Sequence, residues 1–159
     1  MIFITLGSQK FPFDRLLEAV DLLCEKGSIQ EPVFAQTGYS EYQPKHYAYE
    51  KFLDREVFAR KMEQSDLVIT HGGTGAIIGA VKKGKKVVAV PRLAKYGEHV
   101  DDHQLQMTGQ FTEMDLITSC LEMEQLEETL AYAREHDFRP YESNTNRIIA
   151  SLESIIEAL

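Results

Sequence analysis

Short apolar runs alternate along this chain with segments whose apolar residues recur at helical spacing, and this alternation constrains the fold more than any other feature. The runs expected to form strands are Ile2 to Leu6, Pro32 to Thr37, His46 to Leu53, Leu67 to Thr70, Val87 to Val90 and Leu116 to Thr118. The segments expected to form helices are Phe13 to Cys24, Asp54 to Gln64, Thr74 to Lys83, Val100 to Thr112, Met123 to His136 and Asn144 to Leu159. The pattern predicts a parallel sheet of about six strands with helices on both faces, a Rossmann-like doubly wound α/β fold.

Size and composition limit the classes of protein to consider. A chain of 159 residues is expected to form one domain, 1–159. The net charge of −8 argues against a nucleic-acid partner held through its phosphates. Cys24 and Cys120 lie on apolar elements, as thiols in a reducing compartment do. No apolar run approaches the roughly 20 residues of a membrane-spanning helix, and the apolar start is too short for a signal peptide, so a cytoplasmic location is expected.

Three loops are expected to meet at one edge of the sheet. Gly7-Ser8-Gln9, residues 71–75 and residues 91–103 each follow a predicted strand. In doubly wound sheets the ligand lies outside the carboxyl ends of the strands. The candidate functional residues are therefore sought in these loops.

The glycines between residues 67 and 91 nearly match two nucleotide-binding motifs, but the sequence departs from each motif at required positions. A P-loop needs its glycines between a strand and the following helix, whereas Gly84-Lys85 ends a helix and Lys86 stands where a hydroxyl belongs. A dinucleotide fingerprint needs a third glycine where Ile78 stands, and the next strand ends at Pro91 without the acidic residue that holds a ribose.

The sequence His71-Gly72-Gly73-Thr74-Gly75 between a strand and a helix favours an anion site. Glycines let backbone N–H groups approach an anion, and the helix N-terminus adds about half a positive charge. Thr74 is expected to be the N-cap and a hydroxyl donor, and His71 to aim its imidazole at the same point. A tight turn with a hydrogen-bonded histidine would explain the same residues.

Residues 98–104 form an unusually polar loop with two histidines, three acids and an amide. His99 and His103 are four residues apart, as in a helical metal-binding pair, but there is no nearby cysteine and no H-E-x-x-H motif. A hydrogen-bonding surface for a polyhydroxylated ligand is the preferred interpretation. Capping of the following helix would explain Asp101 or Asp102, though not the whole cluster.

Three short motifs, taken in order, resemble a known family. Leu-Gly-Ser-Gln at 6–9, His-Gly-Gly-Thr-Gly at 71–75 and Asp-His-Gln at 102–104 resemble the donor-nucleotide half of GT-B glycosyltransferases. The similarity is to the C-terminal domain of glycosyltransferase family 28, the MurG type, and covers residues 2 to about 121. Within it, the chain is similar to subunits of split enzymes, the PssE/Cps-type capsular polysaccharide subunits and the catalytic subunit of the dolichol-pathway UDP-GlcNAc transferase.

The resemblance implies an inverting, metal-independent transfer of a sugar from a UDP-sugar to a lipid-linked saccharide acceptor in capsular or exopolysaccharide biosynthesis. No cofactor is expected besides the donor. A membrane-anchored partner subunit would bind the acceptor and hold this chain at the inner face of the membrane. The apolar stripe of residues 148–159 is a candidate for docking that partner, or for packing on its own sheet. The alternatives are a non-catalytic supporting subunit and a free-standing nucleotide-binding regulatory protein. The oligomeric state, homo-oligomers included, stays open.

The resemblance also assigns residues. It implies that the diphosphate is held by Gly7, Ser8, Gln9, Gly72, Gly73, Thr74 and Gly75, that Phe52 and Leu53 contact the uracil, and that Asp102 and Gln104 contact the sugar hydroxyls. The candidate catalytic residues are His71, Asp102 and His103, and a partner can instead supply the general base. At Gly79 the family commonly has a Glu that binds the ribose, so the ribose contact departs from the pattern.

Overall fold

The computed structural model of the 159-residue chain describes residues 1–7, 10–99, 101–142, 147, 150–151 and 154. Its elements are β1 (Ile2–Thr5), α1 (Asp14–Glu25), β2 (Val33–Gln36), β3 (Ala48–Glu50), α2 (Arg55–Gln64), β4 (Leu67–His71), α3 (Thr74–Lys82), β5 (Lys86–Val90), η1 (Ala94–Tyr96), α4 (His103–Glu113), β6 (Thr118–Ser119), η2 (Met123–Gln125) and α5 (Leu126–Glu135). The predictions for Ser8, Gln9 and most of the last helix lie outside the described residues. Within the described part, no helix has the length and hydropathy needed to cross a membrane.

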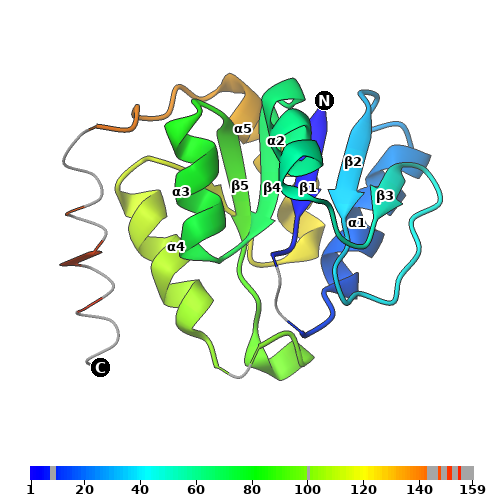
Figure 1. Ribbon diagram of the computed structural model, residues 1–159, viewed down its shortest axis with the longest axis horizontal. Helices are drawn as coiled ribbons and strands as arrows, with labels where there is room; N and C mark the ends of the chain where they lie inside the picture. The colour runs from blue at the N-terminus through cyan, green and yellow to red at the C-terminus, as the bar shows by residue number, and fades with distance from the viewer. Residues whose placement is uncertain (8–9, 100, 143–146, 148–149, 152–153, 155–159) are drawn as a thin grey trace.

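The strands form one six-stranded sheet in the order β3-β2-β1-β4-β5-β6, with every pairing parallel (Figure 1). The chain builds outward from β1 in one direction through β2 and β3, then crosses back to place β4 on the other side of β1. The gap between the carboxyl ends of β1 and β4 is thus the topological switch point, where doubly wound sheets bind ligands. The predicted Rossmann-like α/β fold is confirmed.

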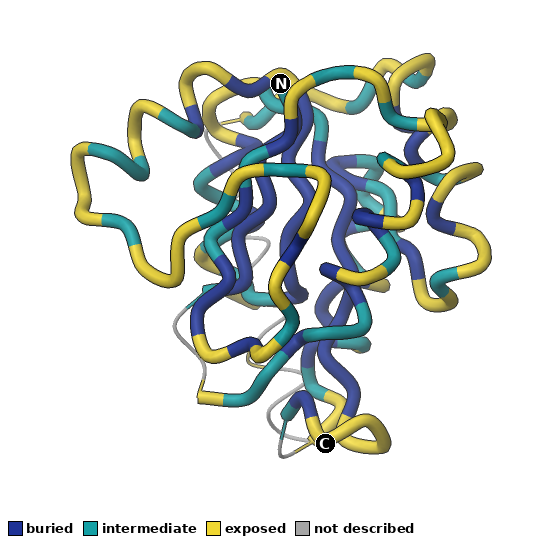
Figure 2. Tube along the Cα trace, turned by 90° about the vertical axis from the view of Figure 1, so that its right-hand side faces the viewer, coloured by how far each residue is buried: buried dark blue, intermediate teal, exposed yellow. Residues whose placement is uncertain are grey.

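Helices cover both faces of the sheet, which forms the buried centre of the molecule (Figure 2). Alternate residues of β1 point to opposite faces. Ile2 and Ile4 belong to the core beneath α1 and α5, while Phe3 packs with residues of α2, α3 and α4. This three-layer arrangement leaves the carboxyl ends of the strands together at the lower edge of Figure 1.

Several predicted boundaries shift. The strand expected over 46–53 is only Ala48–Glu50, the sixth strand is Thr118–Ser119, and the helix expected over 123–136 divides into η2 and α5. The helix expected from Val100 begins at His103. It begins late because side chains hold the preceding turn: Asp101 Oδ1 accepts the His103 N–H (2.9 Å), and Asp102 Oδ1 accepts the Ala94 N–H (3.0 Å).

Candidate functional site

The three predicted loops do converge at the switch point. Gly7 follows β1, His71 ends β4, Arg92 follows β5, and Gln104 lies in the first turn of α4. These four residues come within contact distance of one another or of shared neighbours at the carboxyl edge. The sheet topology therefore assembles the site from segments far apart in the sequence.

The imidazole of His71 is enclosed between two glycines and is only 6% exposed. A Cβ atom at Gly7 would lie 2.5 Å from His71 Nε2, and one at Gly73 would lie 2.8 Å from the same atom. Gly7 also has a φ of +69°, which few other residues adopt. Burial, and then the positive charge of Arg92, lower the pKa of His71 to about 4. His71 is therefore neutral at pH 7.

Gln104 joins three elements through its amide group. It is 4% exposed, and its Oε1 accepts the backbone N–H groups of Gly72 (3.1 Å) and Arg92 (3.0 Å). Its Nε2 lies 3.2 Å from His71 Nδ1. A Cβ atom at Gly72 would lie 2.7 Å from Gln104 Cβ, so Gly72 is required for this packing. The Gly72 N–H, predicted to hold the diphosphate, is bonded to Gln104.

At the N-terminus of α3, the backbone N–H groups that follow Gly72 are available to a ligand. Gly73, with extended φ −75° and ψ 130°, is the N-cap and Thr74 is the first helical residue, so the predicted Thr74 cap is wrong. The position beside the His71 ring has no room for a side chain, which explains why a glycine stands at 73. The Ile77 N–H makes the first bond of this helix, to Gly73 O (3.1 Å). Within the described residues, no acceptor meets the N–H groups of residues 73–76 or the Thr74 hydroxyl.

An exposed aromatic pair lies beyond Gly7 along the same edge. Phe52 and Tyr39 are each 49% exposed, and their rings meet edge to face at 5.2 Å. A Cβ atom at Gly38 would lie 3.5 Å from Gly7 O, which places the Tyr39 loop against the β1 turn. Leu53 instead packs against the core beneath α2. Of the two predicted uracil contacts, only Phe52 is presented to solvent, and the sequence analysis missed Tyr39.

The acids of the 98–104 loop mostly stabilise the loop itself. Glu98 is 3% exposed, and its two carboxylate oxygens each lie 3.0 Å from the guanidinium of Arg15. Asp102 is exposed at the N-cap of α4, with Oδ1 bonded to the Ala94 N–H. His103 is partly exposed, and no described residue bonds its imidazole. Asp102 and His103 thus both present side chains to solvent at the start of α4.

The interpretation of His99 and His103 as a helical metal-binding pair is wrong, because His99 lies before α4 and His103 begins it. His99 Nδ1 instead accepts the Asp101 N–H at 3.3 Å. Across the described ranges, no group of three or more His, Cys, Asp or Glu side chains is arranged to hold a metal ion.

Arg92, which the sequence analysis did not single out, organises the edge. It is 1% exposed, and its guanidinium donates to the carbonyl oxygens of Leu6 (2.7 Å), Phe11 (2.9 Å) and Glu98 (3.2 Å). Burial lowers the pKa of Arg92 to about 10, so it stays charged at pH 7. It fixes the loops after β1 and β5 and places a positive charge beneath the site. The available signal was an arginine directly after a buried strand.

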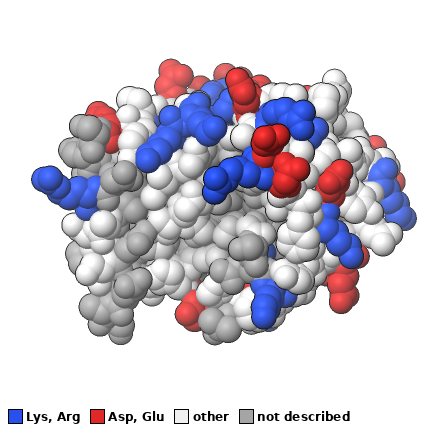
Figure 3. Space-filling view, in the orientation of Figure 1, with Lys and Arg blue, Asp and Glu red and all other residues white. Residues whose placement is uncertain are grey.

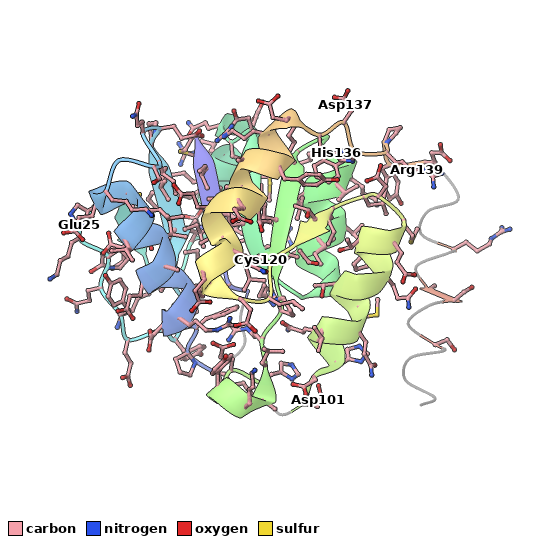
Figure 4. The ribbon with its side chains drawn as sticks, turned by 180° about the vertical axis from the view of Figure 1, so that it is seen from behind. Glu25, Asp101, Cys120, His136, Asp137 and Arg139 are labelled. Atoms are coloured by element: carbon pink, nitrogen blue, oxygen red, sulfur yellow. The ribbon has the colours of Figure 1, made fainter. Side chains whose placement is uncertain are left out.

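Three surface pockets have volumes of about 430, 430 and 460 Å³, and none is lined by a predicted site residue. One of them includes His136, Asp137 and Arg139, at the opposite end of the molecule from Asp101 (Figure 4). On the face of α2 and α3, Lys and Arg side chains gather mainly in the upper half and are mixed with acids (Figure 3). At the carboxyl edge, the backbone N–H groups at the start of α3 are the feature that suits an anion.

Rossmann-like domains commonly bind nucleotides at the switch point, and in the described part of this chain the first N–H groups of α3 have no acceptor there. The chain matches the glycosyltransferase family 28 C-terminal domain over residues 1–159, and it belongs to this family. No curated protein sequence matches it.

Solved structures show the same fold. The chain is similar to the NMR structure of ALG13 with a TM-score of 0.61 and 18% identity, over 95% of this chain and 93% of that one. It is similar to the glycosyltransferase of kitacinnamycin (TM-score 0.61, 15% identity, 99% of this chain and 39% of that one). It is also similar to MurG of Acinetobacter baumannii, with a TM-score of 0.51 and 19% identity, over 98% of this chain and 49% of that one. The chain thus spans less than half of these two larger glycosyltransferases.

Proposed function

We propose that this chain binds a UDP-sugar at the carboxyl edge and, with an acceptor-binding partner, transfers the sugar with inversion to a lipid-linked saccharide. The observation that carries the proposal is the set of N–H groups at the start of α3 that find no acceptor among the described residues, opposite the Gly7 turn, in a family 28 domain. Such a group of donors suits a diphosphate. The motif resemblance supports uridine as the nucleoside.

The geometry suggests how the donor lies. The diphosphate would meet the N–H groups of residues 73–76 and the Thr74 hydroxyl, and the uracil would pack on the exposed ring of Phe52. Gly7 and Gly38 lie next to each other between these two regions, where the ribose would pass. The sugar would extend toward Asp102 and His103 at the start of α4. Contacts from Ser8 and Gln9 stay predictions.

The proposed reaction needs little covalent chemistry from the protein. The acceptor hydroxyl oxygen attacks the anomeric carbon from the face opposite the UDP, and the bond from that carbon to the β-phosphate oxygen breaks. The negative charge that gathers on the departing UDP is stabilised by the α3 N–H groups, the Thr74 hydroxyl and the neutral imidazole of His71. The acceptor proton passes to a base, for which Asp102 and His103 are the candidates on this chain.

A partner is proposed because the chain spans less than half of two larger proteins that share its fold. The chain spans 39% and 49% of two glycosyltransferases that share its fold, whereas it spans 93% of ALG13. The partner would supply acceptor and membrane contacts, and would place this cytoplasmic chain at the inner face of the membrane. Capsular or exopolysaccharide biosynthesis is the proposed pathway, from the motif resemblance.

Calorimetry of the purified chain with UDP and UMP tests the donor site. UDP is expected to bind at least about tenfold more tightly than UMP, because its second phosphate adds charge-assisted hydrogen bonds at α3. GDP serves as the control for recognition of the base and is expected to bind more weakly than UDP. Absent UDP binding, or equal affinities for UDP and UMP, would refute the proposal.

The second candidate function is a supporting subunit without catalytic residues. It is favoured by Gly79, which supplies no carboxylate for a ribose. Sugar transfer by the assembled enzyme separates the two. A large loss of transfer in Asp102→Asn or His103→Gln supports catalysis by this chain, and undiminished transfer in both supports the second candidate.

A further inference from the structure

The side-chain amide of Gln104 has only one orientation that satisfies its neighbours. Two backbone N–H groups, from Gly72 and Arg92, converge on the same side-chain atom at 3.1 and 3.0 Å. An amide nitrogen carries hydrogens and cannot accept either bond, so this atom is the oxygen. The other amide atom, directed at His71, is therefore a hydrogen-bond donor.

That donor determines which nitrogen of His71 carries the proton. Gln104 Nε2 lies 3.2 Å from His71 Nδ1, and two donors cannot share a hydrogen bond, so Nδ1 must present its lone pair. The ring is 6% exposed, which disfavours the doubly protonated cation. A neutral imidazole without a proton on Nδ1 has it on Nε2.

The Nε2 atom faces the gap between the two glycine turns. It lies within 2.5 and 2.8 Å of where a Cβ atom of Gly7 or Gly73 would stand. No described residue accepts a hydrogen bond from Nε2. The α3 N–H groups that also lack partners begin at Gly73, beside this ring.

We propose that Gln104 is a positioning residue that fixes His71 as the Nε2–H tautomer and so directs one more neutral donor at the bound diphosphate. The ligand half of this proposal rests on the proposed function. Gln104 Oε1 and one amide hydrogen are already bonded, so a contact with the sugar hydroxyls can use only the second amide hydrogen. The main role of Gln104 is then exerted through His71, from beneath the site.

The tautomer can be measured without any ligand. Two-bond ¹H–¹⁵N correlation spectra of histidine-labelled wild-type protein distinguish the two neutral tautomers from the cation. The His71 signals are assigned by their loss in His71→Gln. The expected result at pH 7 is a neutral ring protonated on Nε2. A ring protonated on Nδ1, or on both nitrogens, would overturn the proposal whether or not UDP binds.

Gln104→Glu tests the link to the ligand. The carboxylate can still accept both backbone N–H groups, but it presents an acceptor to Nδ1 and draws the imidazole proton there. At pH 8 the spectrum should show the proton on Nδ1, and UDP should bind about tenfold more weakly than to wild type. The exposed Gln106 on the same helix offers a control, because Gln106→Glu adds the same charge. It should leave the His71 tautomer unchanged and change the UDP affinity by no more than about twofold.

The outcomes separate the two proposals. Equal loss of affinity in the two variants would assign the effect to charge alone and overturn the positioning role. A wild-type ring with the expected tautomer in a protein that binds no UDP would support the positioning of His71 and refute the proposed function.

Discussion

Three glycines around His71 have no room for a side chain, and a fourth has ample room. At Gly7 and Gly73 a Cβ atom would press on the His71 ring, and at Gly72 it would press on Gln104. These three are therefore explained by internal packing as well as by any ligand. Gly75 is exposed, and a Cβ atom there would meet nothing within 4 Å. Gly75 is thus the position where a side chain would affect a ligand and spare the fold.

Gly75→Ala is expected to keep or slightly raise stability, by up to about 0.5–1 kcal/mol, because Ala is the better helix former. It should weaken UDP binding about tenfold, since the methyl group would stand among the α3 N–H groups that the diphosphate approaches. Thermal unfolding and calorimetry measure the two effects. Gly109→Ala in α4, also exposed and without neighbours within 4 Å, is the matched control. Equal UDP affinities of the two variants would contradict the placement of the diphosphate.

His71 should make the stability of the protein depend on pH. Its pKa is about 4 in the folded state, against the ordinary value of 6.5 for a histidine. Between these values the unfolded chain binds a proton that the folded protein does not, so stability falls as the pH falls from 6.5 to 4. The loss from this group approaches roughly 3 kcal/mol. Urea unfolding of wild type and His71→Gln over this range should show a steeper loss in wild type, and parallel curves would contradict the assigned pKa.

At the scale of elements, the sequence predicts the three central strands β1, β4 and β5 better than it predicts the edge strands or the start of α4. The apolar runs of β1, β4 and β5 are continuous, as expected of strands buried in a parallel sheet. Parallel topology then places the loops that follow them at one edge. Helix starts depend on the conformation of the preceding turn, which a hydrophobic pattern does not determine. Gly73 rather than Thr74 is the cap of α3, and the bonds that Asp101 and Asp102 accept hold the turn before α4.

The start of α2 was predicted, because its cap is local. Asp54 accepts the Val57 N–H at 2.8 Å, as an N-cap side chain does. Asp54→Ala should lower the free energy of unfolding by about 1 kcal/mol, and Asp54→Asn should restore most of it. Chemical denaturation measures both. An Asp54→Ala variant as stable as wild type would show that the cap contributes nothing.

At the scale of the whole molecule, the geometry and the sequence motifs contribute different parts of the account. The proposed anion site rests on the switch point, on the α3 N–H groups that find no acceptor among the described residues, and on the buried Arg92, all in a family 28 domain. Uridine, the lipid-linked acceptor and the partner rest on the motif resemblance. The sequence did not predict the role of Arg92, because the sequence around an arginine after a strand does not show whether its side chain is buried or exposed to solvent. Only the fold brings Leu6 and Phe11 within its reach.

The central claim is that the N-terminus of α3 binds the diphosphate of the donor. The most direct measurement is a ¹H–¹⁵N titration of the labelled protein with UDP. We predict saturable shifts at the amides of residues 73–76 and of Gly7, with smaller ones near Phe52. Shifts confined to the pocket formed by residues 81–86 and 136–141 at the opposite end of the sheet, or no saturable shifts, would contradict the account.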